Sequence, residues 1–175
     1  VLTNDYTGAF IATEHLIKNN YKKIAHFKGQ KGARNTQPRY NGYIAAIEKY
    51  NFELNPKYIV ECLNCNEEEG YKQTIALFKE AEKPDAIFCV NDEMAIGALS
   101  ALRHLNIKVP EEVGVVGFSN STASKYMYPS LTSIEQSGEE IGKRAAALLI
   151  VIVEPVISTS SARVRLEFES DIVPV

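Results

Sequence analysis

At residues 84–94 the sequence reads PDAIFCVNDEM, and this stretch decides the fold class. The short apolar run at residues 86–90 predicts a strand. Asp92 follows it and is expected to be the N-cap of a helix over residues 93–105, because its side-chain oxygen can accept a hydrogen bond from the first helical turn. This helix has an apolar stripe that can pack on a sheet. The stripe consists of Met94, Ala98, Leu102 and Leu105.

The same order of strand, loop and helix repeats from Lys23 onward in units of about 30 residues. Such a repeat is typical of parallel βαβ construction, in which crossover helices cover both faces of a doubly wound sheet. The predicted fold class is therefore α/β with doubly wound parallel sheets. The predicted strands are residues 24–28, 58–62, 86–90 and 113–118, and the predicted helices between them are residues 38–50, 67–82 and 93–105.

Segments at both ends of the chain do not fit this run. Strands are predicted at residues 1–4, 131–135 and 164–168, helices at residues 8–19 and 137–153, and an exposed turn at residues 158–161. This arrangement predicts two lobes joined by several crossings, one complete and one partial. The partial N-terminal lobe is expected to contain residues 1–21 and 135–155, and the complete C-terminal lobe residues 22–134 and 160–175.

The composition argues against a surface that binds nucleic acid. The chain has 19 Lys and Arg against 22 Asp and Glu, and its formal net charge of -3 has the wrong sign for contact with phosphates. The apolar stretch at residues 145–153 is far shorter than the roughly 20 residues that cross a bilayer, so no membrane partner is expected. The chain begins with Val1 in a strand-like segment, without a signal peptide, and an upstream portion is expected to be missing.

The three cysteines favour a reducing cytoplasm, because an odd number does not form the disulfide framework of a secreted protein. Cys62 and Cys65 form a C-x-x-C, a spacing that elsewhere holds zinc or carries out redox chemistry. A second pair of ligands is absent from the sequence, Cys89 lies inside an apolar run, and a redox C-x-x-C normally opens a helix. No metal site is therefore predicted.

Polar side chains follow the predicted strands at the points where those strands end. In a doubly wound sheet, ligands bind outside the carboxyl ends of the strands. These segments combine amide, hydroxyl, guanidinium and carboxylate groups, which a polyhydroxylated or purine-like ligand needs. They are residues 29–39, residues 63–66, Asn91-Asp92 and Ser119-Asn120-Ser121.

A series of short motifs runs through nearly the whole chain. The motifs include Val1-Leu2-Thr3-Asn4-Asp5, Gly8-Ala9, His15-Leu16-Ile17, Arg39-Tyr40-Asn41-Gly42-Tyr43, Pro84-Asp85-Ala86-Ile87-Phe88, Asn91-Asp92, Val116-Gly117-Phe118 and Pro129-Ser130-Leu131-Thr132. Their order and spacing together resemble the effector-binding domains of the LacI/GalR family of bacterial transcription regulators. The resemblance implies a periplasmic-binding-protein-like fold, which the family shares with periplasmic sugar-binding proteins.

The resemblance also implies that Arg39 points into a cleft between the lobes and binds the effector. Its planar fork can grip vicinal hydroxyls, a carboxylate or a purine oxygen with two bonds. A salt bridge near the loop is the alternative role for this arginine. Arg34-Asn35-Thr36 resembles the segment with which purine-type members hold their ligand. The expected effector-binding residues are Arg34, Thr36, Arg39, Asn91, Asp92, Ser119, Asn120 and Asn4.

The chain departs from the family pattern at several positions, and one of these departures affects the expected effector. Many members carry an Asp where this chain has Ser119, which removes an acceptor for sugar hydroxyls. Arg34 and Arg39 flank one loop, so the balance of charge favours an effector with an anionic or carbonyl-rich edge over a plain neutral hexose. Asn4 and Asp5 stand in the reverse of the usual order.

The function implied is that of a ligand-sensing domain whose small effector is a sugar, a sugar derivative or a purine-like compound. Operator DNA would be bound through a helix-turn-helix domain that is absent from this chain, and the regulator would be a cytoplasmic homodimer. A periplasmic sugar-binding protein of a transport system is the alternative, because one fold serves both tasks. A purely structural dimerisation module explains the polar strand ends less well.

Neither an enzyme nor a cofactor is expected. Gly117-Phe118-Ser119 could begin a nucleophile elbow, but that motif requires Gly at position 121, where this chain has Ser. His15, His26 and His104 lie on predicted helices or within a strand, away from the loops at the strand ends. The sequence also has no phosphate loop or cluster of metal ligands.

Overall fold

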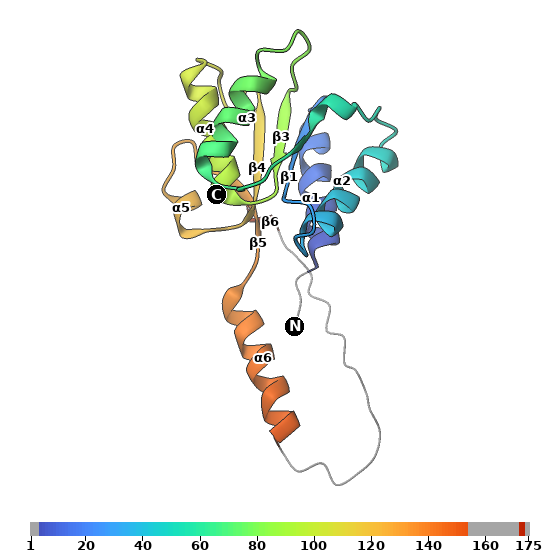
Figure 1. The fold of residues 1–175 in the computed structure, drawn as a ribbon, viewed down its shortest axis with the longest axis vertical. Coiled ribbons are helices and arrows are strands. Elements are labelled where there is room, and N and C mark those ends of the chain that lie inside the picture. Colours follow the sequence, from blue (N-terminus) through green and yellow to red (C-terminus); the bar gives the residue numbers. More distant parts are fainter. Residues whose placement is uncertain (1–3, 154–171, 174–175) are drawn as a thin grey trace.

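The predicted α/β fold is confirmed in a computed structural model, which describes residues 4–153 and 172–173 (Figure 1). Six strands form one sheet in the order β2-β1-β3-β4-β5-β6. The first five strands pair in parallel and β6 pairs antiparallel with β5. The strands are β1 (Ile24–Lys28), β2 (Ile59–Glu61), β3 (Ala86–Cys89), β4 (Gly114–Ser119), β5 (Thr132–Glu135) and β6 (Ile172–Val173).

Two pairs of helices cover opposite faces of this sheet. Helices α1 and α2 pack over one face, and α3 and α4 over the other (Figure 1). The strand order turns back at β1, which pairs with both β2 and β3, as a doubly wound sheet requires. The helices are α1 (Asp5–Lys18), α2 (Thr36–Lys49), α3 (Glu67–Leu77), α4 (Asp92–His104), α5 (Thr122–Lys125) and α6 (Gly138–Val153), with a short 3-10 helix at Pro56–Tyr58.

Strand β1 shows why the central strands are mostly apolar. Successive side chains of a strand point to opposite faces. Ala25 and Phe27 enter the core beneath α3 and α4, while Ile24 enters the core beneath α1 and α2. Because helices cover both faces, residues 24–27 of β1 are all buried, and they are apolar except for His26.

Helix α1 is fastened to α2 by close backbone packing and by one carboxylate. A Cβ atom on Gly42 would lie 2.2 Å from the carbonyl oxygen of Tyr6, so glycine is required for this approach. Glu14 pairs with Nζ of Lys49 at 2.8 Å and with Nζ of Lys18 at 2.9 Å. Hydrogen bonds from Lys49 and Lys18 lower the pKa of Glu14 to about 2.

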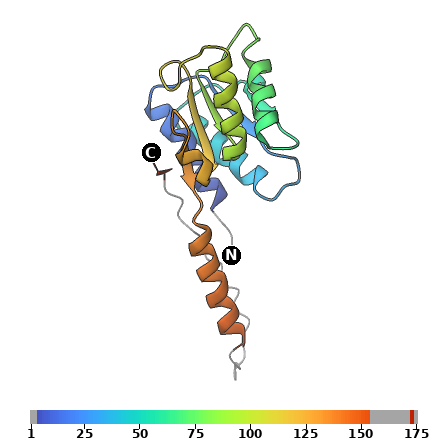
Figure 2. The same ribbon diagram turned by 90° about the vertical axis from the view of Figure 1, so that its left-hand side faces the viewer.

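The packing of α1 bears on the predicted division into lobes. Helix α1 shares its core with α2 and the sheet, so no break in packing falls at residue 21, where the predicted N-terminal segment ends. By contrast, α6 leaves the end of β5 and extends away from the sheet (Figures 1 and 2). The assignment of the chain to two lobes stays a prediction.

Several other predictions concern the C-terminal part of the chain. The strand predicted at residues 164–168 and the turn predicted at residues 158–161 lie outside the described residues. Of the tail, the structure describes the short strand β6 against β5. Among the described residues, every helix is too short or too polar to span a membrane.

The sequence predicted the ends of some elements better than others. The strand at residues 24–28 is confirmed in full as β1. The helix predicted at residues 67–82 is wrong at its end, because α3 stops at Leu77. Beyond it, the N–H groups of Lys79 and Glu80 donate to carbonyls three residues earlier, at 3.2 and 3.3 Å. The chain has therefore tightened into turns that lead toward β3.

Candidate functional site

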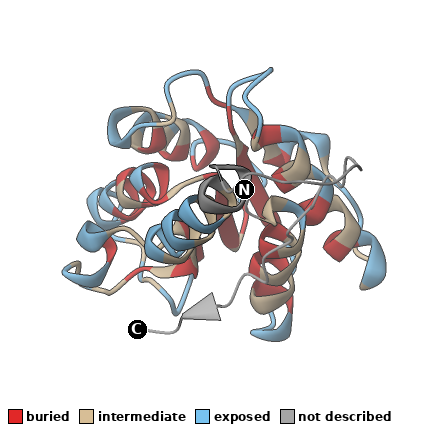
Figure 3. Cartoon of the chain, turned by 90° about the horizontal axis from the view of Figure 1, so that it is seen from below, coloured by how far each residue is buried: buried red, intermediate tan, exposed pale blue. Residues whose placement is uncertain are grey.

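Most of the predicted site residues lie at the carboxyl edge of the sheet, where β1, β3 and β4 end. Helix α6 departs from this same edge, and Figure 3 looks onto it from below, with buried residues concentrated around the sheet. The first turns of α2 and α4 complete the edge, since each follows one of these strands. This is the position at which open α/β sheets bind ligands.

Arg39 is held inside this edge by three groups of the protein. Its Nε and Nη2 atoms lie 2.9 and 2.8 Å from Oδ1 of Asp5, and Nη1 donates to the carbonyl of Val90. The guanidinium carbon stands 3.6 Å from the ring centroid of Phe118. Burial lowers the pKa of Arg39 from its ordinary value, although the Asp5 carboxylate acts in the opposite direction. The salt bridge considered as the alternative role is therefore present, and effector contact by Arg39 stays a prediction.

Asn91, and not Asp92, is the N-cap of α4. Its Oδ1 atom accepts a hydrogen bond from the N–H of Met94 at 3.0 Å. Its Nδ2 atom donates to the carbonyl of Cys65 at 2.8 Å, so this side chain ties the loop after β2 to the start of α4. The prediction that Asp92 caps the helix is wrong, because its carboxylate bonds to groups at β4 and β5 and not to the first turn of α4.

Those partners come from the ends of β4 and β5. Asp92 is fully buried. Its Oδ1 atom accepts from the hydroxyl of Ser133 at 2.6 Å, and its Oδ2 atom accepts from the N–H of Ser121 at 2.5 Å. Asp92 also acts on Arg39 electrostatically and raises the pKa of that guanidinium. Its buried carboxylate is thus part of the framework of the site.

The charges around Arg39 differ from those expected from sequence. Asp5 forms an ion pair with Arg39, and Asp92 adds a second negative charge nearby. Arg34 is exposed on the loop before α2. Two carboxylates therefore offset the buried guanidinium, which removes the basis for expecting an anionic effector edge at Arg39.

Ser119 and Asn120 end β4 with unusual backbone angles. Their φ values are 120° and 48°, in the region that favours glycine. The N–H of Asn120 donates to Oγ of Ser133 at 3.0 Å, and its side-chain amide donates to Glu135. The backbone is thus turned sharply at the position where the sequence predicted effector contacts.

The remaining predicted residues have structural contacts of their own. Thr36 is buried and its hydroxyl donates to the carbonyl of Gln30 at 2.9 Å, which closes the loop between β1 and α2. Asn4 caps α1 by accepting from the N–H of Thr7 at 3.1 Å. These contacts place Thr36 beside the loop that carries Arg34, and Asn4 beside Asp5.

The loop after β2 is fixed by a residue that sequence reasoning missed. The carboxylate of Glu69 accepts backbone N–H groups from Leu63, Asn64 and Cys65 at 2.8, 2.7 and 2.8 Å. Desolvation raises the pKa of Glu69, but these hydrogen bonds outweigh it and leave the pKa below its ordinary value. With the contact from Asn91 to Cys65, this loop is tied to α3 and α4 together.

Asp5, Phe118 and Ser133 were also absent from the expected site. Asp5 is next to the predicted residue Asn4, and Phe118 precedes Ser119, so their positions gave a signal. No feature of the sequence marked Ser133, because a serine between apolar and polar residues in a strand can have many roles. Its contact with Asp92 joins residues 41 positions apart.

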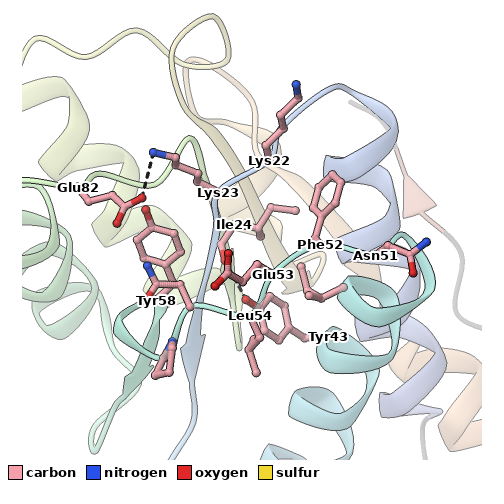
Figure 4. A pocket seen from close by; sticks show the side chains of 13 residues that line it. Lys22, Lys23, Ile24, Tyr43, Asn51, Phe52, Glu53, Leu54, Tyr58 and Glu82 are labelled. Carbon is pink, nitrogen blue, oxygen red and sulfur yellow. Dashed lines mark hydrogen bonds and ion pairs between the residues drawn. The ribbon is translucent and has the colours of Figure 1, made fainter.

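A cavity of about 500 Å³ lies at the opposite, amino edge of the sheet (Figure 4). It is lined by residues from the start of β1 and from the connection between α2 and β2, among them Ile24, Tyr43, Phe52 and Tyr58. The exposed pair Lys23 and Glu82, 3.1 Å apart, borders it. The residues that line this cavity include none of the predicted effector contacts, so cavity and candidate site are separate places.

The cysteines do not combine into a reactive centre in the described structure. Cys62, Cys65 and Cys89 are free, and burial raises the pKa of each thiol. A raised pKa keeps a thiol protonated and unreactive. Within residues 4–153 and 172–173, no three His, Cys, Asp or Glu side chains are grouped for metal binding.

Comparison with known proteins connects this architecture to transcription regulators. The family of periplasmic binding protein-like domains matches residues 13–166. The HTH-type transcriptional repressor PurR of Histophilus somni (strain 2336) is 37% identical over 146 residues, which cover 83% of this chain and 44% of that protein. The chain therefore spans less than half the length of this relative.

Solved structures of regulators have the same fold. A regulatory protein of the LacI family from Chloroflexus aggregans superposes with a TM-score of 0.90 and 26% identity, covering 97% of this chain and 60% of that chain. The transcriptional regulator CelR in complex with cellobiose gives a TM-score of 0.88 and 27% identity, covering 98% of this chain and 51% of that chain. The second of these neighbours holds a sugar.

Proposed function

Because the chain belongs to the family of periplasmic binding protein-like domains, we propose that it is the effector-sensing domain of a LacI-type transcription regulator. The observation that carries the proposal is the set of polar and charged side chains at the carboxyl edge, in a chain whose relatives regulate transcription. A transport protein has less support, since the relatives described above are repressors and regulators. The same relatives support the proposal that the chain catalyses no reaction.

The effector is a sugar, a sugar derivative or a purine-like compound that hydrogen-bonds at the carboxyl edge. Ser119 and Asn120 lie at this edge, while Arg34 lies exposed on the loop after β1. The ion pair between Arg39 and Asp5 favours a neutral, hydroxyl-rich edge next to them, because an added anion would compete with an existing carboxylate. The cellobiose in the related regulator CelR is a neutral ligand of this kind.

The effector acts by shifting a population of conformations. A ligand bound between two lobes favours the closed arrangement only if it binds that state more tightly than the open one. In a cytoplasmic homodimer, closure changes the spacing of two helix-turn-helix domains that lie outside this chain. With its net charge of -3, the chain alone does not bind operator DNA.

Thermal unfolding with defined probes tests the proposal. Cellobiose, glucose 6-phosphate, glucuronic acid and adenine are added in turn, and at least one is expected to raise the melting temperature, because a ligand that binds the folded state stabilises it. Ser119→Ala should reduce that rise, whereas Glu53→Ala, at the amino-edge cavity, should preserve it. No rise with any of the four probes would contradict effector sensing by this chain.

A further inference from the structure

Asp92 and Ser133 form a continuous hydrogen-bonded unit beneath the end of β4. The Ser133 hydroxyl donates to Oδ1 of Asp92 at 2.6 Å and accepts from the N–H of Asn120 at 3.0 Å. Oδ2 of Asp92 accepts from the N–H of Ser121 at 2.5 Å. Two consecutive backbone N–H groups of the loop are therefore linked to one buried carboxylate. The N–H of Ser121 bonds it directly, and the N–H of Asn120 is linked to it through the Ser133 hydroxyl. We refer to this pair as the Asp92–Ser133 clamp.

The neighbouring strand is shaped to admit the carboxylate. A Cβ atom on Gly117 would lie 2.3 Å from Oδ1 of Asp92, so any other residue at this position would force the carboxylate to move. Asp92 is 0% exposed and Ser133 is 1% exposed. A buried carboxylate is costly unless it is well bonded. Gly117, Ser133 and the loop N–H groups together meet that requirement.

The loop above the clamp has a backbone conformation that its residues do not prefer. Ser119 has a φ of 120° and Asn120 a φ of 48°. The φ of Ser119 costs free energy in a residue other than glycine and persists only when surrounding contacts impose it, whereas asparagine adopts the φ of Asn120 more readily than most residues. The clamp supplies those contacts on the two residues that follow Ser119.

We propose that the Asp92–Ser133 clamp holds residues 119–121 in this conformation and thereby aims the side chain of Ser119 at the effector. The proposal rests on the proposed function for its ligand. Asp92 and Ser133 are then positioning residues. The sequence predicted Asp92 as an effector contact, whereas in this proposal it acts through the loop. Both of its oxygens already face protein donors, and the side chain has no exposed surface.

Amide hydrogen exchange tests the clamp without any effector. In Ser133→Ala the N–H groups of Asn120 and Ser121 should exchange about tenfold faster than in the wild type, because one acceptor is removed and the other is left poorly held. Asp92→Asn provides a second variant, in which one oxygen acceptor becomes a donor. The matched control is Thr13→Ala, which removes another buried hydroxyl, bonded to the Ala9 carbonyl at 2.9 Å on α1.

The readout separates positioning from a general loss of stability. Thr13→Ala is expected to speed exchange only in proportion to its effect on global unfolding, and to leave residues 120 and 121 no more affected than the core strands. Ser133→Ala should affect these two amides selectively. If their exchange in Ser133→Ala changes only as much as that of the core, the clamp is overturned.

A ligand measurement completes the test. The affinities of cellobiose and adenine are determined by calorimetry for the wild type, Ser133→Ala and Thr13→Ala. The clamp predicts that the ratio of the two affinities changes at least severalfold in Ser133→Ala and stays the same in Thr13→Ala. An unchanged ratio in Ser133→Ala would contradict a role in specificity. If neither probe binds the wild type, that result bears on the identity of the effector in the proposed function, while the exchange measurement still decides whether the clamp shapes the loop.

Discussion

The two edges of the sheet use charged side chains in opposite ways. At the carboxyl edge Arg39 and Asp92 are 3% and 0% exposed, and each is bonded to protein groups. At the amino edge the Lys23–Glu82 pair is formed by side chains that are 51% and 54% exposed. There Asp85 accepts backbone N–H groups that close the turn into β1. Water can replace such contacts at the amino edge but not at the carboxyl edge.

This difference indicates which edge has a function beyond folding. Removing a charged side chain from water costs free energy, which the surrounding protein must offset. Apolar residues in place of the buried charges would therefore often stabilise the fold equally well or better. Perturbed and buried charges are concentrated at functional sites. The carboxyl edge has this character although the cavity of about 500 Å³ is at the other edge. The burial of these charges therefore identifies the carboxyl edge as the candidate site.

The largest effect should come from removing the buried guanidinium. Arg39→Ala is expected to lower the free energy of unfolding by about 3 to 5 kcal/mol, because Asp5 and Asp92 lose the positive charge between them. Urea denaturation measures the change. The exposed Arg34→Ala is the control, with an expected change below about 0.5 kcal/mol. A small loss of stability in Arg39→Ala would contradict the comparison of the two edges.

Between the two edges, His26 should make the free energy of unfolding depend on pH. The ring is fully buried, its Nδ1 faces the Phe88 carbonyl at 3.0 Å, and its Nε2 has no hydrogen-bond partner among the described residues. Burial lowers the pKa of His26 from 6.5 to about 4. As the pH falls from 6.5 toward 4, the unfolded chain binds a proton that the folded chain does not. Stability should therefore decline, by up to about 1.4 kcal/mol per pH unit.

The variant His26→Phe isolates this effect in unfolding experiments between pH 7 and 5. It keeps an aromatic ring against Phe88, whose centroid lies 4.7 Å from that of His26, and it removes the titrating group. Its stability should decline less with falling pH. His15, whose pKa is also lowered by burial, remains in both proteins. Glu14 loses its contribution only as the pH falls from 4.5 toward 2. Equal pH slopes in the two proteins would contradict the assignment.

The smallest effect is expected at the amino edge. Asp85→Ala should lower the free energy of unfolding by about 1 kcal/mol, because water can satisfy the N–H groups of Lys22 and Lys23 that it releases. It should leave the response to effector unchanged. Thermal unfolding with and without each probe measures both quantities. A loss as large as that of Arg39→Ala would remove the distinction between the edges.

The elements that local sequence determines were predicted best, and those that depend on distant parts of the chain were predicted worst. Strand β1 was predicted to the residue because its mostly apolar sequence, with only His26 inside it, reflects burial at both faces and ends clearly before Gly29. The end of α3 was not, because Lys79 and Glu80 have good helix propensity and stop the helix only through turns that direct the chain toward β3.

The candidate site was predictable only in outline. Its location follows from the polar residues at strand ends, which local sequence displays. The roles within it depend on partners far away in the chain, such as Asp5, which is 34 residues from Arg39, and Ser133, which is 41 residues from Asp92. Asn91 and Asp92 are both good capping residues, and the contacts of Asp92 with the distant Ser121 and Ser133 decide which of the two turns inward.

Mapping of effector contacts by NMR tests the central claim most directly. Amide chemical shifts of the chain are recorded while the most stabilising probe among cellobiose, glucose 6-phosphate, glucuronic acid and adenine is added. We expect the largest changes at the carboxyl edge, at Asn91, Ser119 and Asn120, and little change at Glu53 and Asn55, which line the amino-edge cavity. Changes centred on the amino-edge residues, with the carboxyl edge unaffected, would contradict the account.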